Sequence, residues 1–380
     1  MKLANLIRSR ALRRIGTILF VAIYASMFVE IYLRVFRPAI IMPRYVVDSP
    51  YGVRVNMPNL DIRHKTPDYE IAIRTNAKGV RADREIPYSK PGNLCRIVAL
   101  GDSFTLGYGV SQDDSFLSVM ENELARHGIT AETVNLAVSG HSTTEELIVL
   151  ENEGMKYQPD LILIGWHHTD LKGNGRTGLY RLSDGRLTRA NESFLPAVAA
   201  RKFLFSLRPY RFLAEHSHLY CTTREIASEK AIDLIDWIQS VRKGERSARK
   251  AATAPASPGK HQAEEDLAVA LLKRICEVGR AGGAEVIILD VPRTVREQDR
   301  RRLVSSLPAE AGELCTAYSP IQDLAPFPLE RTFWQRSAGH WTPLGCQIVG
   351  KGLAKSALPV LEKLARNGRF AAAPTKGQPQ

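Results

Sequence analysis

RIVALGDSFTLGYGV, residues 96–110, is the stretch that decides the fold of this chain. Its apolar run at 97–100 predicts a buried strand, which ends at Gly101. Ser103 follows at once, and a helical pattern begins near residue 114. A strand, a glycine and then a helix place the serine at the carboxyl edge of a sheet, where open α/β folds bind ligands. Because a serine alone is a weak nucleophile, this interpretation requires a base elsewhere in the chain.

Apolar runs and helical patterns alternate through most of the remaining sequence. We expect strands at 95–100, 133–137, 161–165 and 285–291. We expect helices at 114–127, 143–157, 264–279 and 344–365. The second of these helices follows Ser142, and Glu145 stands where a capping box needs it. This order predicts an α/β domain with a parallel sheet and helices on both of its faces.

The N-terminus carries a membrane signal. A cationic segment at 1–14 precedes an apolar run that, extended to about residue 36, is long enough to cross a bilayer. The basic flank predicts a cytoplasmic N-terminus and an exported remainder. A retained signal-anchor is the leading interpretation, because no A-x-A cleavage site follows. A cleaved signal peptide and a buried helix of a soluble protein stay open as alternatives.

Composition narrows the possible partners. The 380 residues are 44% hydrophobic and 24% charged, as in globular proteins, and the net charge is +12. The basic balance favours acidic partners such as anionic lipid or an acidic glycan. Nucleic acid is not expected, since no zinc-finger spacing, recognition helix or aromatic-basic RNA motif is present. We expect no cofactor.

The five cysteines lack CxxC or metal-type spacing, and their odd number leaves at least one thiol unpaired within the chain. Cys95 and Cys346 lie in apolar runs that indicate core positions, and a bridge between two of the others is open in an oxidising compartment. His167 and His168 do not indicate a metal site, because adjacent side chains on extended backbone point to opposite faces.

The chain divides into segments with different expected roles. After the anchor at 15–36, residues 37–94 predict a membrane-proximal, β-rich extension that acts as a spacer and edge cover without chemistry of its own. Residues 95–366 predict the α/β domain. Within it, 172–263 predicts an inserted helical cap with a flexible loop, whose aromatic residues, Trp237 included, indicate core packing rather than a sugar platform. The tail at 367–380 is expected to be disordered.

Chemistry-bearing residues follow separate strands of this expected sheet. Ser103 follows the first strand, Ser139, Gly140 and His141 follow the second, and 165–170 ends the third. A fourth segment, 339–343, contains His340 and precedes the last helix. Loops at the carboxyl ends of parallel strands meet on one rim, so a serine, a histidine and hydrogen-bond donors would converge there.

At these residues the chain resembles the SGNH (GDSL-type) hydrolase superfamily. The match rests on GDSFTLGYGV at 101–110, NLAVSG at 135–140 and HWTPLG at 340–345, and it covers about 95–365. It is nearest to the membrane-anchored bacterial branch associated with cell-envelope and exopolysaccharide modification. The resemblance implies a flavodoxin-like three-layer fold, Ser103 as nucleophile and His340 as general base. It also implies an oxyanion hole that includes the N–H groups of Ser103 and Gly140.

Two positions depart from the family pattern. Thr169, before Asp170, stands where the family has an asparagine that donates to the oxyanion. Losing one such donor can cost about 3 kcal/mol. Ser337 and Ala338 stand where the family has the aspartate that orients the histidine. A dyad oriented by a backbone carbonyl, or by an acid from another loop, remains open, and Glu330 and Asp323 are the candidate acids.

Two classes of function follow. The first is a membrane-tethered esterase or O-acyltransferase of the bacterial inner membrane, with its catalytic domain in the periplasm, acting on an O-acyl (acetyl) carbohydrate. A lipid esterase is a variant of this class. The second is a non-catalytic scaffold with the same fold, working with envelope glycan-assembly proteins.

Overall fold

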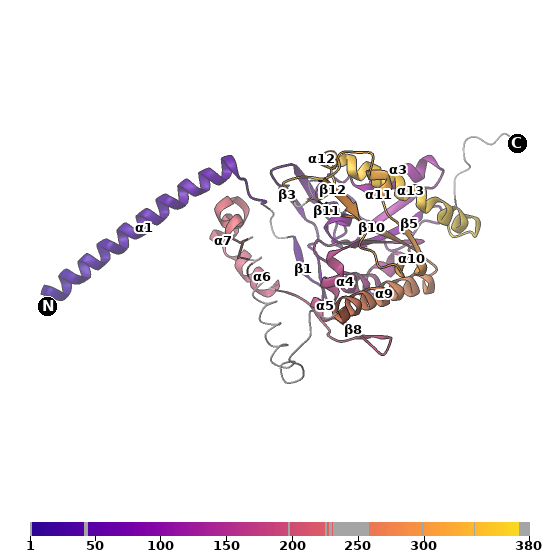
Figure 1. The fold of residues 1–380 in the computed structure, drawn as a ribbon, viewed down its shortest axis with the longest axis horizontal. Helices are drawn as coiled ribbons and strands as arrows, with labels where there is room; N and C mark the ends of the chain where they lie inside the picture. Colours follow the sequence, from indigo (N-terminus) through magenta and orange to yellow (C-terminus); the bar gives the residue numbers. More distant parts are fainter. Residues whose placement is uncertain are drawn as a thin grey trace. The chain divides into compact units, whose positions relative to one another are not determined.

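A five-stranded parallel sheet is the centre of the fold (Figure 1). Its strand order is β13-β10-β7-β5-β6, and all four pairs of neighbouring strands are parallel. In chain order this is the 2-1-3-4-5 arrangement of flavodoxin-like folds, so the predicted fold class is confirmed. The strands are β5 (Cys95–Gly101), β6 (Ala131–Asn135), β7 (Leu161–His167), β10 (Glu285–Val291) and β13 (Thr316–Tyr318).

This computed structural model describes most of the chain. The described residues are 2–41, 45–196, 198–224, 226–227, 230, 258–297, 300–337 and 339–371. Trp237, Ala338, most of the expected flexible loop and most of the expected disordered tail lie outside them.

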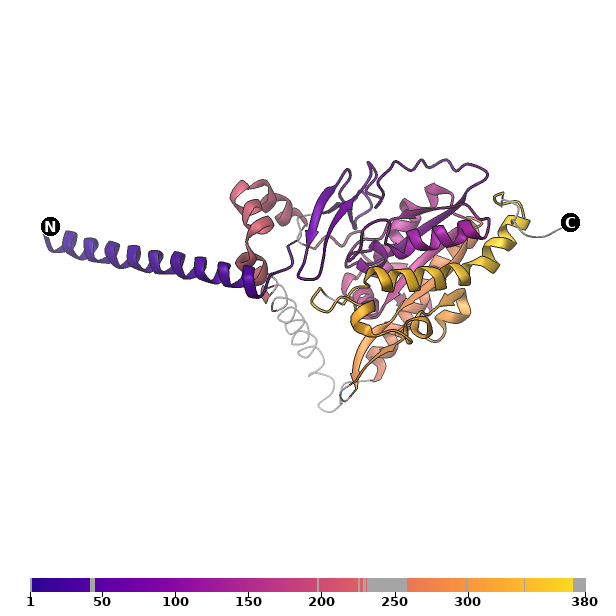
Figure 2. The same cartoon turned by 90° about the horizontal axis from the view of Figure 1, so that it is seen from above.

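Alternating side chains of the sheet build two cores. On one face, Ile97, Ala99 and Leu163 pack with α3 (Phe116–Arg126) and α13 (Pro343–Arg366). On the other face, Val98 and Ile164 pack with α4 (Thr143–Asn152) and α9 (Pro258–Ala281). Because period-two alternation buries both faces, the strands read as continuous apolar runs. Figure 2 shows the sheet between its helices.

Short elements connect these layers. In chain order they are α2 (Ser103–Leu106), η1 (Gly154–Tyr157), α5 (Thr169–Thr177), β8 (Tyr180–Ser183), β9 (Arg186–Arg189), β11 (Arg293–Glu297), β12 (Arg300–Val304), α10 (Ala311–Leu314), α11 (Ile321–Leu324) and α12 (Leu329–Thr332). Two of the pairs, β8–β9 and β11–β12, are antiparallel hairpins. The first part of the segment expected to be a helical cap is therefore the end of α5 and a hairpin, and the sequence analysis did not predict them.

The segment before β5 contributes four short strands: β1 (Val46–Asp48), β2 (Arg54–Asn56), β3 (Asp61–Lys65) and β4 (Glu70–Arg74). They form two two-stranded sheets, β1–β2 and β3–β4. The β-rich character expected for this extension is therefore present. Its contacts with loops of the α/β domain are described below.

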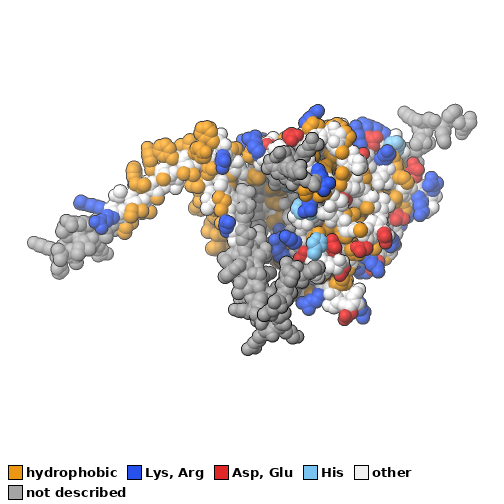
Figure 3. Space-filling view, viewed as in Figure 1, with side chains coloured by type: hydrophobic (Ala, Val, Ile, Leu, Met, Phe, Trp, Pro, Cys, Tyr) orange, Lys and Arg blue, Asp and Glu red, His pale blue; other side chains and the backbone are white. Residues whose placement is uncertain are grey.

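The chain divides into two compact units, and the α/β domain with most of the extension forms the larger one. The smaller unit comprises residues 1–43, 64–70 and 201–255. It contains α1 (Lys2–Phe36), α7 (Arg208–His216) and most of α6 (Val198–Ser206). Within α1, Arg13–Phe36 is long and apolar enough to cross a membrane, with a mean hydropathy of 1.9 and none of it buried. Figure 3 shows hydrophobic side chains along this helix.

Candidate active site

Ser103 is the first residue of α2, directly after the central strand β5. The carboxylate of Asp102 caps this turn by accepting the N–H of Phe104 at 2.8 Å. Gly101 makes the sharp exit from the strand possible: its φ is +152°, and a Cβ there would collide with Oγ1 of Thr105. The chain can therefore turn at once, and the Ser103 hydroxyl faces a cavity at the carboxyl edge of the sheet.

His340 completes a hydrogen-bonded pair with Ser103. Its Nε2 lies 2.7 Å from Oγ of Ser103, although the two residues are 237 positions apart in the sequence. Its Nδ1 lies 3.2 Å from the backbone carbonyl oxygen of Ser337. A carbonyl only accepts hydrogen bonds, so Nδ1 carries the proton and Nε2 is left to accept the serine O–H. This is the tautomer that a general base needs.

Aromatic rings hold the imidazole in place and exclude water from it. The ring centroids of Phe104 and Tyr108 lie 4.8 Å and 4.9 Å from that of His340. His340 is 7% exposed, and burial lowers its pKa below 6.5, the ordinary value for histidine. The imidazole is therefore neutral at pH 7 and able to take a proton.

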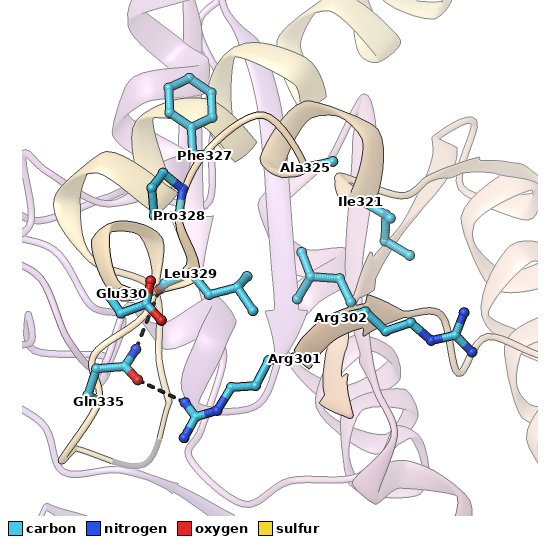
Figure 4. Close-up of a pocket in the computed structure, with 10 residues that line it drawn as sticks. Arg301, Arg302, Ile321, Ala325, Phe327, Pro328, Leu329, Glu330 and Gln335 are labelled. Atoms are coloured by element: carbon cyan, nitrogen blue, oxygen red, sulfur yellow. Dashed lines mark hydrogen bonds between the residues drawn. The ribbon is translucent and has the colours of Figure 1, made fainter. Parts of the chain in front are cut away.

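Neither acid considered as a third member orients His340. Asp323 accepts the hydroxyl of Tyr318 at 2.7 Å. Glu330 lines a separate cavity of about 710 Å³ next to Gln335, which bonds Arg301 and the Leu329 carbonyl (Figure 4). The backbone of Ser337 occupies the orienting position instead. The structure thus pairs Ser103 with His340 and places a backbone carbonyl at Nδ1 of His340, which is one of the arrangements that the sequence left open.

Gly140 and Thr169 line the same cavity as Ser103 and His340. Its volume is about 320 Å³, and loops after β5, β6 and β7 supply most of its wall. Gly140 has φ +76°, a left-handed conformation that favours glycine. Oγ1 of Thr169 lies 2.9 Å from Nδ1 of His167. All four predicted site residues therefore meet in one cavity.

His167 also lies at this cavity, 3.2 Å from a carboxylate oxygen of Asp102 through its Nδ1. Its backbone N–H donates to Asp170 at 3.0 Å. Nδ2 of Asn135 donates to the carbonyl of Thr105 at 3.0 Å, which supports the segment after Ser103. Within the described residues no group of three or more His, Cys, Asp or Glu side chains is arranged to hold a metal ion.

Arg81, from the extension, binds the loop that follows Ser103. Its guanidinium donates to the carbonyls of Leu106, Gly107 and Val110, the latter two at 2.5 and 2.7 Å. The residue is 1% exposed. A charged donor shared by three carbonyls fixes residues 106–110 tightly, so Arg81 positions Ser103 from outside the α/β domain.

Arg54 and Asn56, on β2, bind the second loop of the site. Arg54 donates to the carbonyl of Gly140 at 2.8 Å and pairs with Glu145 at 3.2 Å. Asn56 donates to the carbonyl of Ala137 at 3.0 Å. Nε2 of His141 lies 2.9 Å from the Arg54 carbonyl, and burial lowers the pKa of His141 to about 4. The sequence analysis missed these residues, because nothing in a short β-rich segment indicates which distant loop it contacts.

Two buried carboxyl groups lie beneath the site. Glu146 and Asp170 are 1% and 0% exposed, and both oxygens of Glu146 have no hydrogen-bond partner in the described structure. Burial, together with neighbouring acids, raises both pKa values well above the ordinary range. We conclude that Glu146 is protonated at neutral pH, because an ionised carboxylate without a partner is very costly in the interior.

Glu146→Gln should therefore make folding stability less dependent on pH. The folded protein binds a proton at Glu146 more tightly than the unfolded chain does. Stability is thus highest below the unfolded pKa, about 4.3, and falls as pH rises toward the raised folded pKa. Glutamine does not titrate, so the variant lacks this loss. Its free energy of unfolding, relative to that of the parent, should therefore increase from pH 5 to pH 8. Chemical unfolding at both pH values tests this, and an equal pH dependence in the two proteins would contradict it.

No protein-family model matches the sequence, and no curated protein matches it. Among solved structures, the chain is similar to TesA (TM-score 0.36, 13% identity), covering 71% of this chain and 99% of TesA. It is also similar to a family 3 carbohydrate esterase from Clostridium thermocellum (TM-score 0.38, 11% identity, 72% and 100% covered). A third is an acetyl-xylooligosaccharide esterase from Geobacillus Stearmophilus (TM-score 0.36, 12% identity, 72% and 96% covered). These TM-scores are below 0.5. We therefore infer the chemistry of the site from the positions of its own residues and not from these structures.

Proposed function

We propose that this protein is a membrane-tethered esterase or O-acyltransferase of the SGNH type, acting on an O-acetyl ester of an envelope or extracellular polysaccharide. The observation that carries the proposal is the Ser103–His340 pair, 2.7 Å apart, in a cavity that also holds Gly140 and Thr169. A nucleophile, an oriented base and hydrogen-bond donors at one cavity are the requirements of acyl transfer.

The proposed reaction has two half-reactions. Ser103 Oγ attacks the acyl carbon while Nε2 of His340 takes the hydroxyl proton. The N–H groups of Ser103 and Gly140, with the Thr169 hydroxyl, donate to the tetrahedral oxyanion. His340 then gives its proton to the leaving alcohol oxygen, and an acyl-serine remains. Water or a sugar hydroxyl attacks this acyl-serine, His340 takes its proton and returns it to Ser103, and an acid or a new ester is released.

The shape of the site supports a small acyl group on a larger alcohol. The cavity at Ser103 is about 320 Å³, and a neighbouring cavity of about 680 Å³ has Thr169, Gly173 and Arg176 in common with it. Lys172, Arg176 and Arg293 are exposed side chains at this second cavity, which Glu264 and Glu265 also line. A polar space of this size suits a carbohydrate better than an acyl chain.

The membrane tether in this proposal is α1. Its apolar segment Arg13–Phe36 has 24 residues, which as a helix span about 36 Å, more than the roughly 30 Å of a bilayer core. Arg13 and Arg14 stand at the start of this segment, so we propose that this end is cytoplasmic and that the α/β domain is periplasmic.

Acetyl transfer can be tested with the full-length protein in detergent. We expect acetate release from p-nitrophenyl acetate and from acetylated xylo-oligosaccharides, and much slower release of long acyl chains. With a non-acetylated oligosaccharide added, mass spectrometry should detect acetylated acceptor if the protein is a transferase. A folded protein that releases no acetate from any of these esters would contradict an esterase.

The pH profile should report His340 directly. Its pKa is lowered by burial, so the base stays neutral to a lower pH than an ordinary histidine. The acidic limb of kcat/KM should therefore lie below pH 6.5, with activity rising as pH increases through it. Steady-state rates with p-nitrophenyl acetate between pH 4 and 8 measure the limb, and a midpoint above 6.5 would contradict this assignment.

A non-catalytic scaffold is the second candidate, favoured by one observation: a backbone carbonyl, not a carboxylate, orients His340. A carbonyl stabilises the imidazolium less than a charged partner does, so the rate would be lower than in a full triad. Covalent reaction of Ser103 with a fluorophosphonate separates the two candidates. Absence of labelling in the folded protein favours the scaffold.

A further inference from the structure

The helices α6 and α7, and the residue between them, carry exposed apolar side chains. Four of these side chains, which we call the α6–α7 face, are Phe203, Leu207, Phe212 and Leu213, exposed by 65%, 43%, 62% and 44%. Two bulky aromatic side chains this exposed on adjacent short helices are unusual for a surface in contact with water alone.

Other side chains of these helices are packed. The rings of Phe205 and Tyr210 lie 5.3 Å apart, those of Tyr210 and Tyr220 lie 5.5 Å apart, and the two tyrosine hydroxyls are 2.7 Å from each other. Ala214 is fully buried. These contacts give the helices a packed interior of their own. The exposed apolar side chains are therefore additional to that interior.

Cations stand next to residues of the α6–α7 face in the sequence. Lys202, Arg208 and Arg211 are exposed, and none of them forms an ion pair in the described part of the chain. Aromatic residues beside unpaired Lys and Arg are the composition of helices that lie in the interface of an anionic bilayer.

The end of α7 is bonded to the end of the apolar helix α1. Glu30 accepts hydrogen bonds from Oγ of Ser217 at 2.9 Å and from the N–H groups of His218 and Leu219 at 3.0 and 2.8 Å. Arg34 donates to the His216 carbonyl at 2.6 Å and pairs with Glu30 at 2.8 Å. Glu30 and Arg34 are in the last two turns of α1, where a spanning helix leaves the hydrocarbon. These hydrogen bonds therefore hold the end of α7 at the level where α1 leaves the hydrocarbon of the bilayer.

We propose that the α6–α7 face lies in the headgroup region of the membrane that α1 crosses, with Phe203 and Phe212 in the upper acyl chains and the cations at anionic phosphates. The partner is a lipid surface. This inference rests on the proposed membrane anchor. It adds that the helices at residues 198–216 attach the protein to the leaflet where α1 leaves the membrane, at Glu30 and Arg34.

Photo-crosslinking to lipid tests the inference. The full-length protein, with p-benzoylphenylalanine at Phe203 or Phe212, is placed in nanodiscs of equimolar phosphatidylcholine and phosphatidylglycerol and irradiated. We expect phospholipid adducts at both positions by mass spectrometry. The matched control is the same photoreactive residue at Phe327, an exposed phenylalanine of the α/β domain, where we expect none.

A position within α1 separates the two possible failures. A p-benzoylphenylalanine in place of Phe20 should also crosslink to lipid, because Phe20 lies inside the apolar segment. Lipid adducts at Phe20 but not at Phe212 would overturn the interface and leave the anchor intact. No adducts at either position would overturn both, and adducts of Phe212 to a second copy of the chain would replace lipid by a self-interface. In nanodiscs of phosphatidylcholine alone, the yield of lipid adducts at Phe203 and Phe212 should fall severalfold relative to the mixed nanodiscs. The Lys202→Gln, Arg208→Gln, Arg211→Gln triple variant should show the same fall in the mixed nanodiscs.

A second observation, at two cysteines, is independent of the membrane. Sγ of Cys276, on α9, lies 2.6 Å from Sγ of Cys315, just after α10. Two sulfur atoms in van der Waals contact lie farther apart than this, so the distance points to a covalent bond between them. Cys95, Cys221 and Cys346 are each buried elsewhere. We infer that Cys276 and Cys315 form a disulfide when the domain is exported.

Formation of this bond is an oxidation. Two thiols lose two protons and two electrons to a disulfide-bearing oxidoreductase, which is reduced to its dithiol, and one S–S bond joins α9 to the segment before β13. The full-length protein, purified from an exporting bacterial host without reductant and then denatured, should show three reactive thiols of the five cysteines. Peptide mapping should find Cys276 linked to Cys315. Five reactive thiols, or a different linkage, would overturn the inference, and Cys315→Ser should show four.

Discussion

Ser103→Ala is expected to reduce ester hydrolysis by a factor of about 1,000 or more, and to abolish covalent labelling by a fluorophosphonate. The reason is that Oγ of Ser103 is the atom 2.7 Å from the Nε2 of His340, so alanine removes the atom that would carry the acyl group. Hydrolysis of p-nitrophenyl acetate measures the loss, and mass spectrometry of the labelled protein identifies the modified residue.

Two comparisons make this result interpretable. Ser183→Ala, an exposed serine on the β8–β9 hairpin, should keep both hydrolysis and labelling. Circular dichroism of Ser103→Ala should match the parent, because the side chain is small and partly exposed. If Ser103→Ala hydrolysed esters as fast as the parent, or if labelling moved to another residue, the nucleophile assignment would be wrong.

Arg81→Met is expected to destabilise the α/β domain by about 3 kcal/mol and to lower activity in the fraction that stays folded. The substitution removes a buried charge that donates to the carbonyls of Leu106, Gly107 and Val110, and these would be left without their donor. Buried acceptors that lose a charged donor cost about 1.5–3 kcal/mol or more. Thermal and chemical unfolding measure the stability change.

Arg74→Met is the matched control for Arg81→Met. Arg74 is on β4 of the same extension, about half exposed, and pairs with Asp61 and Asp83 at 3.3 and 3.6 Å. Exposed ion pairs contribute at most about 1 kcal/mol, so this variant should unfold close to the parent. Equal destabilisation by the two substitutions would mean that Arg81 has no special role in the loop after Ser103.

The sheet could be predicted because its strands are buried on both faces and therefore read as apolar runs. The strand Glu285–Val291 begins and ends where the sequence predicts. The second strand was placed at 133–137 but is Ala131–Asn135, because residues 136–138 are apolar and still bond to β5 after the strand ends. The edge strand Thr316–Tyr318 was missed, because it is short and mostly exposed.

At the site, residue types that carry chemistry could be found, but backbone partners could not. Ser103 and His340 belong to distinctive motifs, and the structure brings them together. The group that orients His340 is the Ser337 carbonyl, which every residue type possesses and which therefore leaves no sign in a sequence. Arg81 and Arg54 were missed for a related reason: their partners are also carbonyls, 25 to 86 positions away.

The contacts of Arg54, Asn56 and Arg81 also decide how the protein can be shortened. All three precede β5, the first strand of the sheet, yet they bind the loops that form the rim of the candidate site. A fragment cut at Cys95 would keep every sheet strand and lose these contacts. The smallest fragment with a working rim should therefore start ahead of β1, near residue 45, and any excision of the anchor has to stop short of that point.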